Sequence, residues 1–341
     1  MRWTGPASRS RAYTEYGSAT SSAGSTRGGL LGVVADMDST LTIEFNQTVN
    51  SSPERWARAE RLDAERMTDA LYSQTGVRLT VQGPCPGGQV GAAYVRWADG
   101  RRSVLKWRPH SRLADIQAGP LSVADILRSP EYPAPATELA VQTGHAVVVV
   151  QELLPGAKID NLDHRGLEQA LELNRLQTGR LADRPDIPPV GLHLSEDGSG
   201  YCLHEPLRRH NRRSAALERW ITAVGQDNPD RLGGYDAVHY DFHPGNLLAV
   251  GGAITGIVDW DGAGRGDRRL DLVTLRFGIH AKTCEPGVAE RLDDVLDALP
   301  DTFLRLAWAH MSLRMVDWAI RHFAPADVEH WLDIAEQRAY Q

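Results

Sequence analysis

The chain has 341 residues and a formal net charge of -7, and 42% of its residues are hydrophobic. It is long enough for two lobes with a sizeable core, and its charge argues against a general role in binding nucleic acid. No run of eighteen apolar residues is present that would span a membrane. The three cysteines, Cys85, Cys202 and Cys284, lack the spacing of a disulfide framework or a zinc site. We therefore expect a reducing, cytoplasmic location.

The first 66 residues differ in composition from the rest of the chain. Residues 17–29 are rich in Ser, Gly and Thr, as flexible segments are, and residues 52–67 are charged and could form a helix. We expect residues 1–66 to be a leader that is either disordered or not part of the native fold. The sequence does not decide between these two interpretations.

This leader contains a short pattern that resembles the first motif of haloacid-dehalogenase-type phosphatases. An apolar run is followed by D-x-D-x-T, in which Asp36 would be the nucleophile and Asp38 the acid or base. Only about twenty-five residues separate the pattern from the next folded unit, far fewer than a domain needs. A chance match is the favoured interpretation, and a phosphatase activity is kept as an alternative.

From Met67 onward the residue pattern predicts a small antiparallel sheet. A glycine-rich connection with Gly87 and Gly88 follows the first predicted strand, and a helix that Gly119-Pro120 breaks or kinks precedes the last two strands. The very apolar residues 147–150 predict a buried central strand. The predicted strands cover residues 77–81, 92–97, 102–107, 137–142 and 146–151, and the predicted helix covers residues 113–128.

Beyond Leu154-Pro155-Gly156 the pattern is mainly helical, with one embedded hairpin at residues 246–261. We therefore predict an α+β fold of two lobes, with an N-lobe at 67–152, a C-lobe at 153–341 and a ligand cleft between them. The predicted helices cover residues 162–181, 214–224, 288–299, 302–323 and 325–339. The basic cluster at residues 208–213 is interpreted as a solvated helix face.

One segment of the C-lobe carries the pattern H-x-D-x-x-x-x-N, with His239, Asp241 and Asn246, and the hairpin after it ends at Asp259. Phosphoryl transfer needs a carboxylate to orient the acceptor hydroxyl and hard oxygen ligands to hold Mg²⁺. Protein kinases space their catalytic Asp and their metal-binding Asn and Asp in the same way. The pattern thus favours Asp241 as catalytic base and Asn246 and Asp259 as metal ligands. His239 and His243 are expected to hold the loop by hydrogen bonds.

The sequence of this segment resembles that of the aminoglycoside phosphotransferase/choline kinase family, which has H-G-D-x-H-P-G-N followed by I-D-W-[DE]. The similarity continues through Gly266-Asp267 and Asp271-Leu272 and covers about residues 67–335. It implies a protein-kinase-like fold that transfers the γ-phosphate of ATP, with Mg²⁺, to a hydroxyl of a small molecule such as an aminoglycoside-type antibiotic or a related metabolite. Two departures stand out: Tyr240 replaces the usual glycine and Arg268 the usual proline.

The resemblance also implies a nucleotide site in the N-lobe. Lys106 would bind the phosphates, the segment with Gly87 and Gly88 would lie near them, and the hinge at 151–154, including Glu152, would hold adenine. Of the 37 basic residues only Lys106, Lys158 and Lys282 are lysine, which favours a need for a compact ammonium at Lys106.

Several points stay open at this stage. The acidic partner of Lys106 could be Asp115 or Asp125, and a non-catalytic nucleotide-binding module is an alternative function. The Trp and Met residues of 308–318 fit a core better than an acceptor site. The sequence names neither the acceptor nor the oligomeric state. An acidic pocket for a polycationic acceptor has the C-lobe candidates Glu285, Asp293, Asp294 and Asp317.

Overall fold

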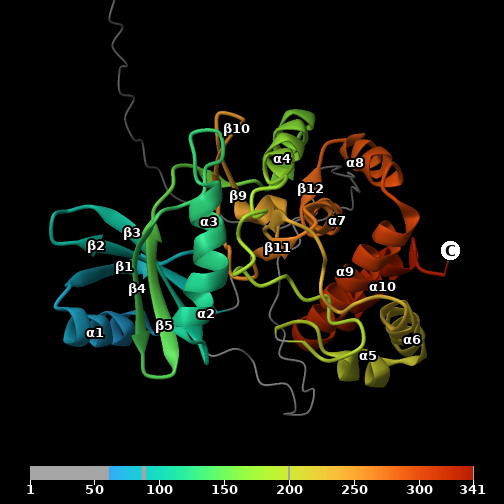
Figure 1. Ribbon diagram of the computed structural model, residues 1–341, viewed down its shortest axis with the longest axis horizontal. Helices are drawn as coiled ribbons and strands as arrows, with labels where there is room; N and C mark the ends of the chain where they lie inside the picture. The colour runs from blue at the N-terminus through green and yellow to red at the C-terminus, as the bar shows by residue number, and fades with distance from the viewer. Residues whose placement is uncertain (1–60, 87–89, 199, 341) are drawn as a thin grey trace, which may run out of the picture. The chain divides into compact units, whose positions relative to one another are not determined.

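The computed structural model describes residues 61–86, 90–198 and 200–340. The predicted leader up to residue 60, the Asp36/Asp38 pattern, and Gly87 and Gly88 lie outside the described residues, so what was expected of them stays a prediction. Figure 1 labels most of the helices and strands that are described. In the first part of the chain these are α1 (Ala64–Thr75), β1 (Leu79–Pro84), β2 (Ala92–Trp97), β3 (Arg102–Pro109), α2 (Leu113–Ile116), the π-helix η1 (Gln117–Leu121), α3 (Ser122–Leu127), β4 (Thr137–Thr143) and β5 (Ala146–Glu152).

The strands β1 to β5 form one antiparallel sheet, as the sequence predicts (Figure 1). Their order in the sheet is β1-β2-β3-β5-β4. Alternate residues of β5 point to opposite faces. Val148 and Val150 join a core cluster with α1, whereas Val147 and Val149 join one with α2 and η1. Because helices cover both faces, every residue from Ala146 to Gln151 is buried and the strand has no polar side.

Helix α1 covers one face of this sheet through Met67 and Leu71. Asp63 caps its first turn by accepting a hydrogen bond from the backbone N–H of Arg66 at 3.1 Å, and Gly76 ends it with a left-handed φ of 71°. The boundary expected at residues 66/67 falls inside this helix, so the folded lobe already includes Asp63. The division into lobes at residue 152 is not tested by these contacts and stays a prediction.

The helix on the other face is irregular at Gly119-Pro120 and is not interrupted there. Both residues lie inside η1, and the chain continues directly from α2 into α3. Proline has no N–H to donate to the preceding turn, and here it lies inside a wider π-helical turn. The Ser122 hydroxyl donates to the Gln117 carbonyl at 2.6 Å, which satisfies an acceptor within the widened turn.

The rest of the described chain is mainly helical, as predicted, with short two- and three-stranded pairings. Its elements are β6 (Ala157–Lys158), β7 (Asn161–Leu162), α4 (His164–Leu176), α5 (His204–His210), α6 (Arg212–Gln226), β8 (Asp236–Val238), the 3-10 helix η2 (Pro244–Asn246), β9 (Leu247–Val250), β10 (Ala253–Ile257), β11 (Gly264–Gly266), α7 (Arg269–Gly278), β12 (Thr283–Cys284), α8 (Val288–Asp297), α9 (Asp301–His322) and α10 (Pro325–Glu336). The sequence patterns missed α7, and of α5 they indicated only the end, as the solvated helix face at residues 208–213.

A large core cluster joins α6, α7, α9 and α10. Trp308 and Met311 of α9 are buried in it, so the interpretation of these residues as core is confirmed. The basic cluster at 208–213 forms a charged surface, where Arg213 pairs with acids of α10 and Arg208 with Glu218. Among the described residues, no helix combines the length and the apolar character needed to cross a membrane.

Candidate active site

The segment with the H-x-D-x-x-x-x-N pattern connects β8 to β9, and Asp271 of α7 holds its backbone by hydrogen bonds. The buried Asp271 carboxylate accepts hydrogen bonds from the backbone N–H groups of His239 at 2.7 Å and Tyr240 at 2.8 Å, and from Gln177 Nε2 at 2.8 Å. Burial raises the pKa of Asp271 to about 6 against the opposing effect of these hydrogen bonds. Asp271 therefore acts on the loop backbone.

His239 and His243 also hold the loop, in agreement with the expectation from the sequence. The His239 Nε2–H donates to the carbonyl of Val258 at 3.1 Å, and its Nδ1 accepts from the backbone N–H of Asp241 at 3.3 Å. Burial lowers the pKa of His239 to about 4, so the ring is neutral. His243 Nδ1 accepts from the Gly245 N–H at 3.1 Å.

Tyr240 shows why the related family prefers glycine at this position. Its φ is 73°, in the left-handed region where a side chain is disfavoured. The ring packs against His310 at a centroid distance of 5.1 Å, and the hydroxyl donates to the Gly191 carbonyl at 2.7 Å. A Cβ at Gly262 would lie 2.5 Å from the Tyr240 ring, so a residue without a side chain is needed there. Contacts on several sides thus hold Tyr240 in its unfavourable conformation.

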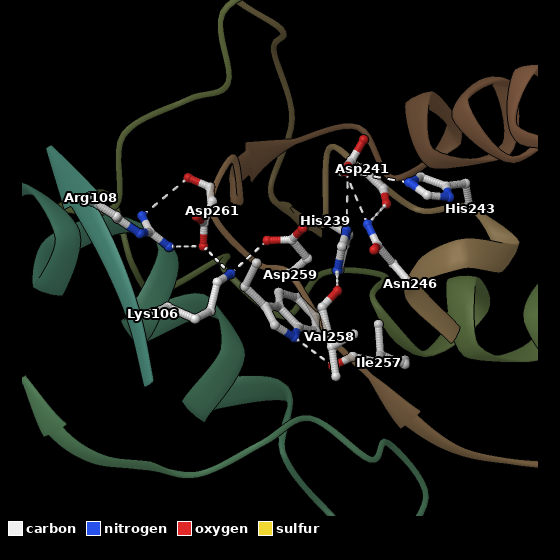
Figure 2. A network of polar contacts seen from close by, with 11 residues as sticks. Lys106, Arg108, His239, Asp241, His243, Asn246, Ile257, Val258, Asp259 and Asp261 are labelled. Atoms are coloured by element: carbon white, nitrogen blue, oxygen red, sulfur yellow. Dashed lines mark hydrogen bonds and ion pairs between the residues drawn. The ribbon is translucent and has the colours of Figure 1, made fainter. Parts of the chain in front are cut away.

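The Asp241 carboxylate lies at the centre of this loop (Figure 2). Asn246 Nδ2 donates to its Oδ2 at 3.0 Å and to its backbone carbonyl at 2.9 Å, and His243 Nε2 lies 3.5 Å from Oδ2. Arg314 Nη2 of α9 lies 2.9 Å from Oδ1. Burial by itself would raise the pKa of Asp241, but the Arg314 guanidinium and the nearby histidines outweigh it and hold this pKa far below the usual range.

A second cluster of charges joins β3 to the segment after β10 (Figure 2). The Lys106 ammonium donates to Asp259 Oδ1 at 2.6 Å and to Asp261 Oδ1 at 2.8 Å, and Arg108 also pairs with Asp261. Burial acts to lower the pKa of Lys106, but the two carboxylates raise it above the ordinary lysine value. Asp259 has a φ of 69°, so two residues of this site, Tyr240 and Asp259, adopt a left-handed backbone.

The structure corrects the expected acidic partner of Lys106. Asp115 pairs with Arg112 and Asp125 with Arg128, each within its own exposed turn, and Lys106 instead contacts Asp259 and Asp261. Ile116 and Leu121 pack on the sheet and Val123 and Leu127 join another core cluster, and the Asp115 and Asp125 carboxylates are exposed.

Glu152 lies at the end of β5, where the hinge was expected. Its backbone N–H donates to the Ala136 carbonyl at 2.9 Å, and its carboxylate accepts from the Ala136 N–H at 3.1 Å. These bonds tie the end of β5 to the segment before β4. A role of Glu152 in binding adenine stays a prediction.

Asn246 and Asp259 offer a fitting pair of oxygen ligands for Mg²⁺. The Val258 N–H donates to the Asn246 carbonyl at 2.9 Å, which brings the end of the hairpin beside Asn246. The Asn246 amide nitrogen is bonded to Asp241, so its oxygen is the atom left for a ligand. Among the described residues no group of three or more His, Cys, Asp or Glu could hold a metal ion.

Sequence reasoning missed Arg314. It lies 73 residues from Asp241 on a helix whose Trp and Met residues indicated core, and no local motif marks it. Three of the four acids considered for a cationic acceptor are engaged within the protein. Asp293 pairs with Arg276 and Arg338, Asp317 pairs with Arg321, and Glu285 accepts from the backbone N–H of His164.

The antiparallel sheet lobe, the helical part and the loop–hairpin that bears Asp241 and Asp259 define a protein-kinase-like fold. The sequence model of the Phosphotransferase enzyme family matches residues 82–309. The chain belongs to this family, and the resemblance drawn from the sequence is confirmed.

Solved structures agree on the fold. A thermostable mutant of aminoglycoside phosphotransferase APH(4)-Ia, in ternary complex with AMP-PNP and hygromycin B, matches with a TM-score of 0.58 and 17% identity over 80% of this chain and 95% of that one. Spectinomycin phosphotransferase APH(9)-Ia, in complex with ADP and spectinomycin, matches with a TM-score of 0.53 and 14% identity over 81% and 98%. No curated protein sequence matches the chain significantly.

Proposed function

We propose that the chain is an ATP-dependent small-molecule kinase, which transfers the γ-phosphate of Mg·ATP to a hydroxyl group. The observation that carries this proposal is the arrangement of four groups around one loop and its hairpin. The Asp241 carboxylate and the Asn246 amide are in direct contact, and the Asp259 carboxylate faces Lys106 from the sheet lobe (Figure 2). Family membership and nucleotide-bound structures with the same fold support this proposal.

In this function Asp241 would orient the acceptor hydroxyl and receive its proton. A strongly basic carboxylate is not required, because positioning and charge neutralisation supply most of the catalysis in phosphoryl transfer. The low pKa of Asp241 is compatible with that role, since it keeps the group ionised and able to accept a hydrogen bond. The bonds from Asn246 and the histidine-held loop fix the direction of the carboxylate.

Asn246 and Asp259 would hold the metal, and Lys106 would bind nucleotide phosphates. When bound, Mg²⁺ neutralises charge on the phosphates during transfer. In the described structure Lys106 rests on Asp259 and Asp261, so these two carboxylates keep the ammonium charged and in place. With nucleotide present we expect Lys106 to exchange at least one of these contacts for phosphate oxygens.

The proposal is tested by incubating the full chain with Mg·ATP and a panel of hydroxylated antibiotics and metabolites, and by detecting phosphorylated products by mass. We expect one class of acceptor to gain a phosphoryl group, and we expect no product with AMP-PNP or with EDTA present. Asp259→Asn should lower transfer strongly, whereas Asp186→Asn, which changes an exposed carboxylate paired with Arg184, should not. Binding of Mg·ATP without transfer to any acceptor would instead support a non-catalytic nucleotide-binding module.

A further inference from the structure

Arg314 places a nearly buried positive charge directly beside the proposed catalytic base. The side chain projects from the middle of α9 and is 16% exposed, and its Nη2 lies 2.9 Å from Asp241 Oδ1. It also donates to the backbone carbonyl of Tyr240, and its Cζ lies 4.7 Å from the centre of the Tyr240 ring. The guanidinium is thus held in one position by a carboxylate, a carbonyl and an aromatic face.

The two oxygens of Asp241 have different neighbours. Oδ2 faces Asn246 and His243, which belong to the same loop, and Oδ1 faces Arg314, which comes from a distant helix. Arg314 therefore occupies the side of the carboxylate that the loop leaves open. A hydroxyl that approaches Asp241 from this side meets the guanidinium as well.

The acidic residue of α9 nearest to Arg314, Asp317, is engaged within the protein. Two turns farther along α9, Arg321 lies over the Tyr201 ring at 4.9 Å and forms a 2.8 Å ion pair with Asp317. The Asp317 carboxylate is fully buried and also accepts from the backbone N–H of Leu203 at 2.9 Å. Its charge is therefore used within the protein, and it is not available to an amino group of a ligand.

We infer that the acceptor carries an anionic group, a carboxylate or a phosphate, close to the hydroxyl that is phosphorylated, and that Arg314 is the residue that selects it. This inference rests on the proposed function, because it assigns the acceptor of that same site. An anion beside the hydroxyl gives the guanidinium a second partner next to Asp241, and the planar fork of arginine suits both carboxylate and phosphate. A polycationic acceptor would place like charges together at this point, which disfavours its binding.

The experiment compares acceptors that share a carbon skeleton and differ in charge, with the full chain and Mg·ATP. One set is glucuronate, glucose 6-phosphate, glucose and glucosamine, and a smaller set is glycerate, glycerol and 3-amino-1,2-propanediol. Hygromycin B serves as the polycation. We expect kcat/KM for the best anionic member of a set to exceed that of its neutral counterpart by about tenfold or more, the effect of one charge-assisted contact. Comparing kcat/KM for glucuronate and glucose 6-phosphate shows whether a carboxylate or a phosphate is preferred.

Variants of Arg314 separate selection from a purely structural role. Arg314→Gln should raise the KM for the anionic acceptor by about 10- to 100-fold and leave the KM for ATP within about twofold, and Arg314→Lys should restore part of the loss. Arg305→Gln is the matched control, since Arg305 lies about two and a half turns earlier on α9, over the Trp220 ring. An equal fall of kcat for all acceptors in Arg314→Gln would overturn the assignment.

The outcomes also distinguish this inference from the proposed function. Preferential phosphorylation of glucosamine or hygromycin B would overturn the anionic acceptor and leave the kinase assignment intact. Mg·ATP binding without phosphorylation of any member of either set, or of the wider panel, would overturn the kinase assignment and the inference with it.

Discussion

At the scale of single residues, Lys106 was singled out because lysine is rare in this chain. The chain otherwise uses arginine for its basic residues, apart from Lys158 and Lys282. In the structure the Lys106 ammonium lies between the carboxylates of Asp259 and Asp261, at 2.6 and 2.8 Å. A compact group with three donors can reach both acids, whereas a planar guanidinium needs more room and a different direction of approach.

We therefore expect Lys106→Arg to lower kcat/KM for ATP by about 10- to 100-fold although the charge is kept, because the larger group cannot take the same position. Steady-state kinetics at saturating acceptor measures this effect. Lys158→Arg, at an exposed position of β6, serves as the control and should change kcat/KM by less than about twofold. An active Lys106→Arg enzyme would show that the position requires only positive charge.

That the residues of the loop lie at one site could be predicted, because they belong to one short motif. Asp241, Asn246 and Asp259 lie within nineteen positions of one another, and the hairpin between them brings them together. Arg314 was not predictable, since it joins the site only through the packing of α9 against the loop. The acidic partners of Lys106 were missed because they come from the segment after β10 and not from the helix that follows β3.

At the scale of secondary structure, α9 connects the core to the candidate site. Its residues Trp308 and Met311 are buried in the core, while Arg314 reaches Asp241 and His310 packs against Tyr240. His310 Nδ1–H donates to the Leu192 carbonyl at 2.8 Å. Burial, together with the nearby Arg314, lowers the pKa of His310 to about 3. The folded protein therefore keeps this ring neutral.

This neutral histidine predicts a specific dependence of stability on pH. Below about pH 6.5 the unfolded chain binds a proton at His310 that the folded chain does not, so acid favours unfolding. Relative to His310→Gln, the wild type should lose about 1.4 kcal/mol of unfolding free energy per pH unit as the pH falls from about 6 to 4.5. Urea unfolding of both proteins across this range measures the difference. A difference that does not vary with pH would mean that His310 is charged in the folded state.

The elements that the sequence predicted well have a strong periodicity or clear turn signals. The sheet strands and α8, α9 and α10 agree with the predicted ranges to within a few residues. Helix α7 was missed because all of its residues from Leu270 to Gly278 are buried, so no polar face marks it. Helix α5 has only seven residues, so its basic end indicated a helix face but its start could not be predicted.

At the scale of the whole molecule, the sheet and the helical part meet at charged groups. Lys106 and Arg108 of β3 pair with Asp259 and Asp261, which follow the β9–β10 hairpin (Figure 2). Because these contacts lie where the phosphates of a nucleotide would bind, we expect nucleotide binding to rearrange them. The two-lobed, kinase-like fold was predictable from the order of strands and helices and from the loop motif, and it is confirmed by the structures that share it.

The central claim is that Asp241 directs phosphoryl transfer at this site. The most direct test is single-turnover transfer from Mg·ATP to a saturating acceptor by Asp241→Asn, measured beside the Kd for Mg·ATP. We predict that transfer falls by about a thousandfold or more, since the carboxylate that orients the hydroxyl is lost, while Kd changes by less than about threefold. Transfer at a rate close to that of the wild type, with Kd unchanged, would contradict the assignment of Asp241.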